Sequence, residues 1–375
     1  MGNGVANELV SQMNPCRERS ALTSLTSVSM SQKGDFDEIV DVRSPAEFAE
    51  DHVPGAVSAP VLDDAERARI GLLHKQASAF EAKRAGAALV AANIARHLTT
   101  LFAGRPKSWR PLVYCWRGGQ RSGSMVEVFT RIGWRAAQLD GGYKAYRRHV
   151  IGELERLPPA LDLRIVCGVT GSGKSRMLRA LIGAGAQVLD LEELARHRGS
   201  VLGNLPGEVQ PSQKMFESLL AHKLAGFDVE RPVYAEAESK KVGSVQVPTA
   251  LIERMRRSTC LRIEIGTALR IALLKDEYAH FLAAPRTLDE RLDCLVDLHG
   301  HARVAEWKAL SAKGAWDALV EKLLLEHYDP AYLRGMARNY VGYAAAPVLQ
   351  VTAIDEASMR DIARAVVRGT SLPMH

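Results

Sequence analysis

Residues 111–124, Pro-Leu-Val-Tyr-Cys-Trp-Arg-Gly-Gly-Gln-Arg-Ser-Gly-Ser, are the strongest indication of the fold. The apolar run at 111–114 predicts a buried strand, and apolar residues recur at helical spacing over 125–132. Cys115 therefore lies where a strand passes through a glycine-rich loop into a helix. Backbone N–H groups of such a loop and the helix N-terminus favour thiolate over thiol, so the pattern predicts a nucleophilic cysteine rather than a buried structural one.

The same loop predicts a binding site for an anion. Arginines supply fixed positive charge, and glycines allow the backbone to approach a bound oxyanion closely. We predict Cys115 and Arg121 as catalytic residues. The residues predicted to bind the anion are Trp116, Arg117, Gly118, Gly119 and Gln120.

Composition limits the classes of protein to which the chain can belong. Its 375 residues are enough for two or three domains, and its net charge of +6 suits an anionic partner, either nucleic acid or a phosphorylated small molecule. The five cysteines are scattered without a CxxC pair, which argues against a disulfide framework and a cysteine-based zinc site. We find no signal-peptide core and no apolar run of the roughly 20 residues that a membrane helix needs. We therefore expect a cytoplasmic protein with no membrane partner.

Short strands alternate with helices around the Cys115 loop, which is typical of a parallel α/β sheet. Residues 41–48 (Asp-Val-Arg-Ser-Pro-Ala-Glu-Phe), residues 52–56 (His-Val-Pro-Gly-Ala), the Cys115 loop and residues 141–142 (Gly-Gly) resemble the rhodanese family in the order that this family shows them. The resemblance implies that Cys115 forms a covalent chalcogen adduct. It also implies that Arg121 and the loop amides hold the anionic donor.

The length of the loop differs from that of many single-domain rhodaneses. Arg121 follows Cys115 by six positions, one more than is usual there, which suits a bulkier anion than thiosulfate. Rhodanese-like phosphatases have a similarly long loop, so length alone does not choose between the two chemistries. The sequence offers no clear general acid for a phosphatase.

A second motif occupies residues 168–175, Gly-Val-Thr-Gly-Ser-Gly-Lys-Ser, between a strand predicted at 161–167 and a helix from Arg176. This is the G-x4-G-K-S pattern of a P-loop in its strand–loop–helix context. Its N–H groups can wrap a diphosphate, its lysine neutralises charge, and its last serine can ligate Mg²⁺. The predicted diphosphate-binding residues are Gly168, Thr170, Gly171, Ser172, Gly173, Lys174 and Ser175.

Carboxylates downstream of the P-loop are candidates for the acid that organises Mg²⁺ or acts in acid–base chemistry. Asp190 ends a strand predicted at 187–190, and Glu236 and Glu238 follow another that begins at Arg231. Solvated charge at a strand end explains each acid equally well when it is taken singly. We predict no metal site made of protein ligands alone, and Ser175 as the candidate Mg²⁺ contact.

From Thr249 onward the pattern is mainly helical and rich in arginine, including Arg254 and Arg270, with Tyr340 further along. Such a surface can hold RNA phosphates and stack bases, although a charged helix face is more often simply solvated. The predicted fold is α/β. Its parts are a flexible tail at 1–32, a rhodanese-like parallel-sheet domain at 33–150, a linker at 151–160, and an α/β domain like that of P-loop NTPases at 161–375 with a helical, basic C-terminal part.

Together with residues 197–200 (His-Arg-Gly-Ser) and 213–217 (Gln-Lys-Met-Phe-Glu), the two domains closely resemble the family of bacterial tRNA 2-selenouridine synthases over residues 33–350. The resemblance implies a selenotransferase with tRNA geranyltransferase activity. In that family, wobble 2-thiouridine in the tRNAs for Lys, Glu and Gln is S-geranylated with geranyl diphosphate. Selenium from selenophosphate then replaces the S-geranyl group through a perselenide, here on Cys115. Selenophosphate and geranyl diphosphate are the implied co-substrates, Mg²⁺ is a candidate cofactor, and tRNA and a selenophosphate-supplying enzyme are the implied partners.

Two other functions stay open from the residues alone. One is a rhodanese-type sulfurtransferase fused to an ATP-dependent small-molecule kinase, which the P-loop would also suit. The other is a non-catalytic regulator that senses phosphorylated ligands. An intact Cys115 and an intact Gly-Lys-Ser loop argue against the regulator.

Overall fold

The computed structural model describes residues 26–76, 78–200, 203 and 207–369. The chain divides into two compact units. The first unit comprises Met1–Ala49 and Gly55–Tyr146, and the second comprises Glu50–Pro54 and Arg147–His375. Each unit has its own parallel sheet and core, as expected from the two separate motifs.

The first unit is built around a five-stranded parallel sheet. Its strands, in spatial order, are β1 (Ser27–Val28), β5 (Ala137–Leu139), β4 (Pro111–Tyr114), β2 (Glu38–Asp41) and β3 (Val57–Ser58). The predicted strand at 111–114 is the central one and is buried along its whole length. Continuous burial explains why this strand is apolar without alternation.

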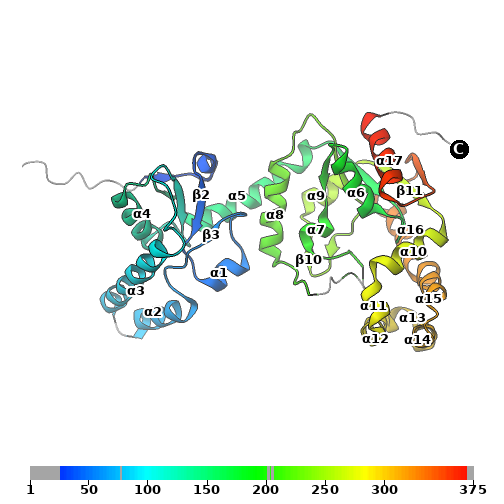
Figure 1. Ribbon diagram of the computed structural model, residues 1–375, viewed down its shortest axis with the longest axis horizontal. Helices are drawn as coiled ribbons and strands as arrows, with labels where there is room; N and C mark the ends of the chain where they lie inside the picture. Colours follow the sequence, from blue (N-terminus) through cyan, green and yellow to red (C-terminus); the bar gives the residue numbers. More distant parts are fainter. Residues whose placement is uncertain (1–25, 77, 201–202, 204–206, 370–375) are drawn as a thin grey trace, which may run out of the picture. The chain divides into compact units, whose positions relative to one another are not determined.

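Helices complete the first unit (Figure 1). They are η1 (Met30–Asp35), α1 (Pro45–Glu50), α2 (Asp64–Gln76), α3 (Ala79–Thr99), α4 (Gln120–Ile132) and α5 (Gly142–Arg156), of which α1 and α5 extend into the second unit. The stretch between β3 and β4 contains two helices, α2 and α3, which pack against each other. Ser78 starts α3 by accepting a hydrogen bond from the Glu81 N–H at 3.0 Å.

The ends of the first unit differ from the predicted domain boundaries. The predicted tail at 1–32 lies outside the described residues as far as residue 25, but its last part is ordered: β1 pairs with β5, and Met30 is buried. A two-residue strand is too short to produce a detectable alternation. At the other end, α5 runs to Arg156 through the first half of the predicted linker, and Pro158 begins the short helix η2 (Pro158–Ala160).

The second unit has a five-stranded, all-parallel sheet. Its strands, in spatial order, are β12 (Val348–Val351), β11 (Thr259–Ile265), β6 (Leu163–Cys167), β8 (Val233–Glu236) and β7 (Gln187–Leu189). Strands β11 and β12 were not predicted, and they lie within the region from Thr249 that is otherwise mainly helical, as expected. In β11, Arg262 pairs with Glu264 at 2.9 Å, so two charged residues interrupt the apolar pattern of an inner strand.

Helices and a small hairpin cover this sheet. They are α6 (Lys174–Gly183), α7 (Leu191–Ala195), α8 (Gln213–Ala225), α9 (Thr249–Arg256), α17 (Glu356–Arg368) and the antiparallel pair β9 (Lys241–Val242) and β10 (Val245–Gln246). Helices α6 and α17 pack together, and their apolar faces join the sheet in one core that includes Val166, Leu178 and Met359.

The remaining helices of the second unit gather around a core of their own (Figure 1). They are α10 (Thr267–Glu277), α11 (Ala279–Ala283), α12 (Pro285–Asp293), α13 (Val296–His299), α14 (His301–Ala312), α15 (Trp316–Leu323), the π-helix η3 (Leu324–Tyr328) and α16 (Asp329–Asn339). Trp307 is fully buried at the centre of this helical group. The predicted fold class is therefore confirmed, including the helical C-terminal part.

Candidate active sites

Cys115 directly follows the central strand β4, and the loop after it leads into α4. Two glycines give this loop its shape. Gly118 has φ +65°, and a Cβ there would lie 2.6 Å from the Leu139 carbonyl oxygen. Gly142 has φ +55°, and its Cβ would lie 2.3 Å from the Cys115 carbonyl oxygen. Both positions therefore require glycine, because the turn at residues 141–142 packs directly against the loop.

The sulfur of Cys115 is surrounded by hydrogen-bond donors. The Ser122 hydroxyl lies 3.2 Å from Sγ, and the Gly119 N–H lies 3.3 Å from it. Burial by itself raises the pKa of Cys115. The hydrogen bonds from the Ser122 hydroxyl and from the N–H groups of Ser122, Gly119 and Arg117 outweigh burial, and the net pKa lies below its ordinary value. These hydrogen bonds are the physical reason why the loop favours the thiolate form of Cys115.

Ser122 and Gln138 are residues of this site that sequence reasoning did not select. Gln138, on β5, donates from Nε2 to the Ser122 hydroxyl at 2.7 Å and to the Gly119 carbonyl at 2.9 Å. With its oxygen occupied as an acceptor, the Ser122 hydroxyl is free to direct its hydrogen at the sulfur. A buried polar side chain inside an otherwise apolar strand was the available signal for Gln138.

The other predicted residues of the loop have different surroundings. The side chain of Arg121 pairs with Glu47 at 3.3 Å, and Arg67 pairs with the same carboxylate. Trp116 stacks on Tyr143 with ring centres 5.2 Å apart. Arg117, Gly119 and Gln120 are exposed, which leaves the mouth of the loop accessible.

Replacing Ser122 with alanine should raise the pKa of Cys115 because it removes the closest donor to the sulfur. We expect alkylation by iodoacetamide at pH 7 to slow about 3- to 10-fold, with the pH–rate curve displaced to higher pH. The matched control is Ser124→Ala on the same helix, whose hydroxyl donates to the Gln120 carbonyl at 2.9 Å instead. Peptide mass spectrometry assigns the alkylated cysteine. An unchanged curve for Ser122→Ala would contradict this account of the thiolate.

The P-loop at 168–175 connects β6 to α6 and closes around its own lysine. Lys174 Nζ donates to the Gly168 carbonyl at 2.9 Å, and the Gly168 N–H donates to the Tyr332 hydroxyl at 2.7 Å. Ser172 is fully buried, and Ser175 is the second residue of α6 and half-buried. The predicted strand–loop–helix context is confirmed.

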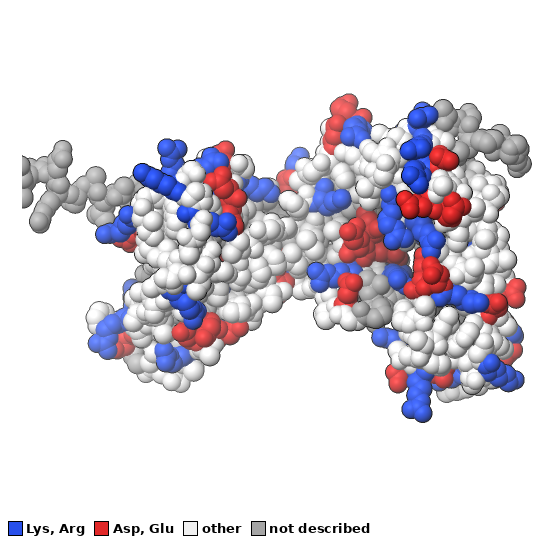
Figure 2. Space-filling model, in the orientation of Figure 1, with Lys and Arg blue, Asp and Glu red and all other residues white. Residues whose placement is uncertain are grey.

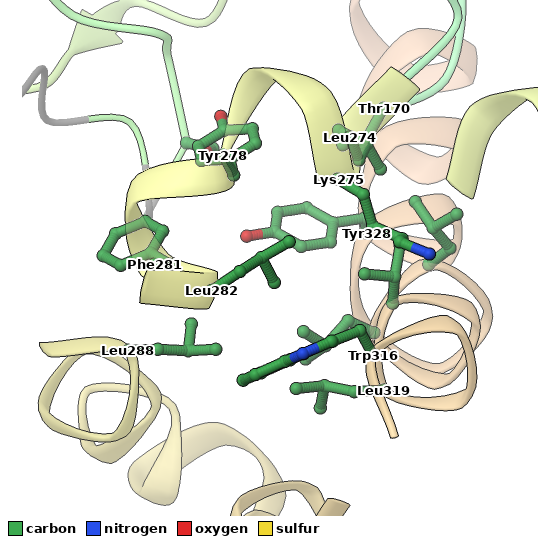
Figure 3. A pocket seen from close by; sticks show the side chains of 14 residues that line it. Thr170, Leu274, Lys275, Tyr278, Phe281, Leu282, Leu288, Trp316, Leu319 and Tyr328 are labelled. Atoms are coloured by element: carbon green, nitrogen blue, oxygen red, sulfur yellow. The ribbon is translucent and has the colours of Figure 1, made fainter. Parts of the chain in front are cut away.

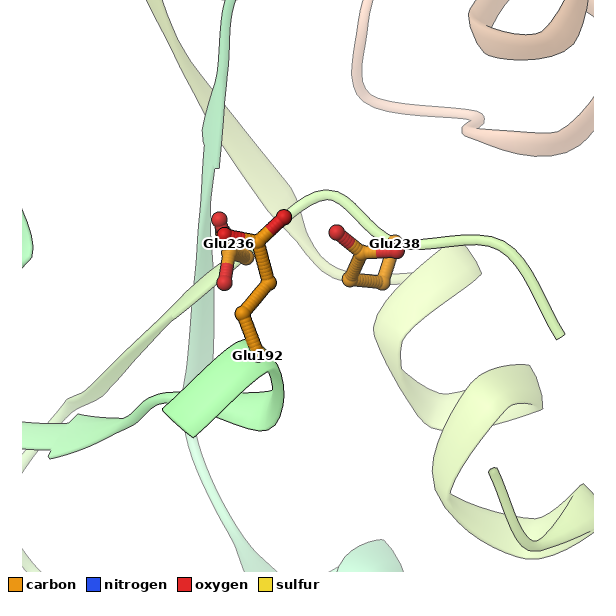
Figure 4. A group of neighbouring side chains, drawn as sticks. All are labelled: Glu192, Glu236 and Glu238. Atoms are coloured by element: carbon orange, nitrogen blue, oxygen red, sulfur yellow. The ribbon is translucent and has the colours of Figure 1, made fainter. Parts of the chain in front are cut away.

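Three glutamates gather near this lysine (Figure 4). One carboxylate oxygen from each of Glu192, Glu236 and Glu238 lies within 4.8 Å of the others. Glu192 belongs to α7, Glu236 ends β8, and Glu238 follows two residues later. Burial, and then the charge of Glu238, raise the pKa of Glu192 to about 8. Lys174 opposes the rise for all three, so its charge acts on the whole cluster.

The cluster differs from the predicted set of acids in one member. Glu236 and Glu238 take part as predicted, but Asp190 caps α7 and accepts from the Glu193 N–H at 2.8 Å. Glu192 takes its place, because the first turn of α7 directs its side chain toward the end of β8 (Figure 4). In the sequence, Glu192 could have been recognised from the short acidic run that follows strand β7. The sequence alone does not determine which acid of this run points toward the interior.

The donor atoms of this cluster fit a hard divalent cation. Glu236 is 1% exposed, and neither of its carboxylate oxygens has a hydrogen-bond partner among the described residues. A buried, unpaired carboxylate is costly, and oxygen ligands are those that Mg²⁺ prefers. The three glutamates therefore suit Mg²⁺, and Ser175 stays a predicted further contact.

Without Mg²⁺ the second unit should lose stability as the pH rises. The pKa of Glu192 is about 8 in the folded protein, against an ordinary 4.5. A carboxyl with a raised folded-state pKa contributes fully to stability below its unfolded pKa, and this contribution is lost as the pH rises through the folded pKa. We expect the melting temperature in EDTA to fall by about 3 to 8 °C between pH 5 and 8.5, and Mg²⁺ to restore it at pH 8.5. Differential scanning calorimetry provides the measurement.

Glu236→Gln separates the cluster from other titrating groups. In this variant the melting temperature should depend less on pH, and Mg²⁺ should raise the melting temperature at pH 8.5 much less than in wild type, because the buried carboxylate charge is gone. Glu193→Gln, an exposed neighbour on α7, is the control and should behave as wild type. Equal stabilisation of Glu236→Gln and wild type by Mg²⁺ would rule out this site.

Three of the residues considered as RNA contacts are engaged in the interior. Arg254 donates to the Leu161 carbonyl, and Arg270 is buried and pairs with Asp329. Tyr340 is also buried, and its hydroxyl donates to the Glu238 carbonyl at 2.7 Å. Figure 2 shows acidic and basic side chains interspersed on the visible face of the second unit. The sequence left open whether these three side chains contact RNA, and the structure uses them for contacts within the fold instead.

None of the helices in the described part of the chain combines the length and the apolar character needed to cross a membrane.

Comparison with known proteins identifies both units. A model of the tRNA 2-selenouridine synthase AAA domain matches residues 161–288, and a model of the rhodanese-like domain matches residues 27–149. A tRNA 2-selenouridine synthase of Bdellovibrio bacteriovorus is 32% identical over 355 residues, which cover 81% of this chain and 90% of the relative. Those of a Sulfurovum species and of Marinobacter nauticus are also 32% identical, over 80% and 78% of this chain and 89% and 87% of the relatives. The chain thus belongs to the tRNA 2-selenouridine synthase family.

Proposed function

We propose that this enzyme replaces the 2-thio sulfur of wobble uridine with selenium in the tRNAs for Lys, Glu and Gln, in two steps that use its two units. The observation that supports this most is that two loops of the chain each offer a setting suited to an anion. One is the Cys115 loop, whose donors stabilise a thiolate, and the other is the P-loop, whose Lys174 acts on three carboxylates. Sulfur activation and selenium transfer have different requirements, which two separate sites can meet.

The first step is S-geranylation at the second unit. The sulfur of 2-thiouridine attacks C1 of geranyl diphosphate, the C1–O bond breaks, and inorganic diphosphate leaves. Lys174 and the loop N–H groups would stabilise the charge of the departing diphosphate. Glu192, Glu236 and Glu238 would hold Mg²⁺, which when bound supplies further neutralising charge. The alkyl group makes sulfur a better leaving group from C2 of the base.

The second step is selenium transfer at the first unit. The Cys115 thiolate would attack the selenium of selenophosphate, so that an S–Se bond forms, the Se–P bond breaks, and phosphorus leaves with the bonding pair as phosphite. The perselenide would then attack C2, from which geranylthiolate departs with its bonding pair. A thiol reductant, required as a co-reactant, would attack the Cys115 sulfur and break the S–Se bond, which leaves selenium on the base and a mixed disulfide on Cys115. The donors at Ser122 and Gly119 favour the anionic form of Cys115, and Arg121 would hold the anionic donor. The implied setting is the cytoplasm, with tRNA and a selenophosphate-supplying enzyme as partners.

The proposal is tested by nucleoside mass spectrometry on 2-thiouridine tRNA incubated with the protein. With geranyl diphosphate alone, S-geranyl-2-thiouridine should accumulate, and adding selenophosphate and a thiol reductant should convert it to 2-selenouridine. ATP turnover is recorded in parallel without RNA. If no modified base appears and ATP is hydrolysed, an ATP-dependent small-molecule kinase fused to a sulfurtransferase becomes the better account.

A further inference from the structure

The helical group of the second unit encloses an apolar pocket (Figure 3). Its cavity volume is about 60 Å³, several times the roughly 10–15 Å³ that one water molecule needs on the same measure. Its walls come from α10, α11, α12, α15 and η3. Apolar side chains that line it include Leu274, Phe281, Leu282, Leu288, Trp316 and Leu319. The predominance of hydrocarbon suits an apolar ligand group.

The P-loop forms one boundary of this pocket. Thr170 lines it, and the Thr170 carbonyl accepts a hydrogen bond from Arg270 Nε at 2.9 Å. The two terminal nitrogens of Arg270 contact both carboxylate oxygens of Asp329 at 2.9 and 2.6 Å. Asp329 directly follows Tyr328, which also lines the pocket. A buried bidentate ion pair therefore holds the pocket wall and the diphosphate loop in a fixed geometry.

The pocket wall includes a π-helical segment, η3, whose first and last residues, Leu324 and Tyr328, both line the cavity. Such segments are rare and frequently occur at functional sites. Figure 3 shows the Tyr328 ring directed into the same space as Leu282 and Trp316. The unusual backbone thus lies where the pocket is formed.

Several of the polar groups around the pocket already have partners among the described residues. The hydroxyls of Tyr278 and Tyr328 interact with the Ser200 hydroxyl, and Lys275 forms an ion pair with Asp317. A nucleoside attached to a diphosphate here would bring ribose hydroxyls and base nitrogens into a space with few free partners, which is unfavourable. A hydrocarbon chain makes no such demand.

We propose that this pocket binds the hydrocarbon chain of a prenyl diphosphate whose diphosphate lies in the P-loop. The second unit would then recognise the two chemically different ends of one substrate, with Thr170 at the junction. This inference rests on the proposed function, since it takes the P-loop as a diphosphate site. It adds where the chain binds and which residues select a hydrocarbon over a nucleoside.

Binding of three ligands to the full-length protein tests the proposal by isothermal titration calorimetry with Mg²⁺. The ligands are inorganic diphosphate, geranyl diphosphate and ADP. Geranyl diphosphate should bind at least about 100-fold more tightly than inorganic diphosphate, because each buried CH₂ group adds about fourfold in affinity. The affinity of ADP should not exceed that of inorganic diphosphate by a comparable factor.

A bulky side chain that fills the pocket should weaken the binding of geranyl diphosphate without weakening the binding of inorganic diphosphate. Leu282 is half-buried at the pocket, so Leu282→Trp should reduce the preference for geranyl diphosphate to about 10-fold or less while affinity for inorganic diphosphate changes less than about twofold. Leu298→Trp is the matched control, because Leu298 is 68% exposed and does not line the pocket. It should keep the wild-type preference.

Tryptophan fluorescence gives a second readout that does not depend on a bulky substitution. Geranyl diphosphate should shift the emission of Trp316 in wild type, inorganic diphosphate should not, and Trp316→Phe should lose the shift. If neither diphosphate binds wild type, the P-loop assignment itself fails. If both bind but geranyl diphosphate shows no advantage, or Leu282→Trp retains it and no Trp316 shift occurs, the pocket is not the prenyl site.

Discussion

Cys115→Ala should lower the formation of 2-selenouridine by at least about 1,000-fold and leave S-geranyl-2-thiouridine as the end product. The first unit would lose its only proposed selenium carrier, whereas the P-loop, the three glutamates and the apolar pocket all belong to the second unit. Nucleoside mass spectrometry measures both bases in one sample. Intact-protein mass spectrometry should show a selenium adduct on wild type and none on the variant.

The control for this substitution is Cys294→Ala, which removes an exposed free thiol outside the loop. It should convert tRNA at the wild-type rate. Continued geranylation by Cys115→Ala shows that the variant is folded, so loss of selenium alone is informative. Wild-type selenium incorporation without Cys115 would overturn its role as carrier.

Lys174→Ala should reduce geranylation by about 100- to 1,000-fold, because the departing diphosphate loses its main cationic partner. The same variant should still convert tRNA that has been geranylated beforehand, since that step uses Cys115. Lys174 also lowers the pKa of the three neighbouring glutamates, so melting curves with Mg²⁺ are recorded beside activity. Calorimetry should show weakened binding of inorganic diphosphate.

Lys313→Ala serves as the matched control, because Lys313 is exposed at the end of α14. It should geranylate tRNA normally. The two variants Cys115→Ala and Lys174→Ala are therefore expected to fail at opposite steps. If Lys174→Ala geranylates normally, or loses both steps while remaining folded, the division of labour between the two units is wrong.

Local sequence accounts for much of what the structure shows. The apolar strand before Cys115, the glycines after it and the Gly-Lys-Ser motif each depend on neighbours within a few positions, so their strand–loop–helix contexts were predicted correctly. The end of α5 before Pro158 likewise has a local cause, because proline lacks the N–H that a helix requires.

Long-range packing determines the features that were missed. Gln138 reaches Ser122 only because β5 pairs with β4. Arg270 and Tyr340 are buried, and Arg254 is bound to the Leu161 carbonyl, through elements distant in the chain. The sequence analysis missed strands β11 and β12, because strand formation depends on pairing with neighbouring strands as well as on local residue preference. Strand β11 pairs with β6 and β12, which are distant from it in the sequence.

Spacing along the chain therefore predicted the two domains, the candidate nucleophile and the candidate diphosphate loop, since each is a contiguous motif whose backbone geometry is local. Which acid joins Glu236 and Glu238, and where a hydrocarbon chain fits beside Thr170, depended on the folded chain. The sequence gives no reason to choose between the carboxylates of Asp190 and Glu192. In the structure, Asp190 caps α7, whereas Glu192 points toward Glu236. An apolar pocket wall is likewise indistinguishable from core until packing leaves space between the side chains.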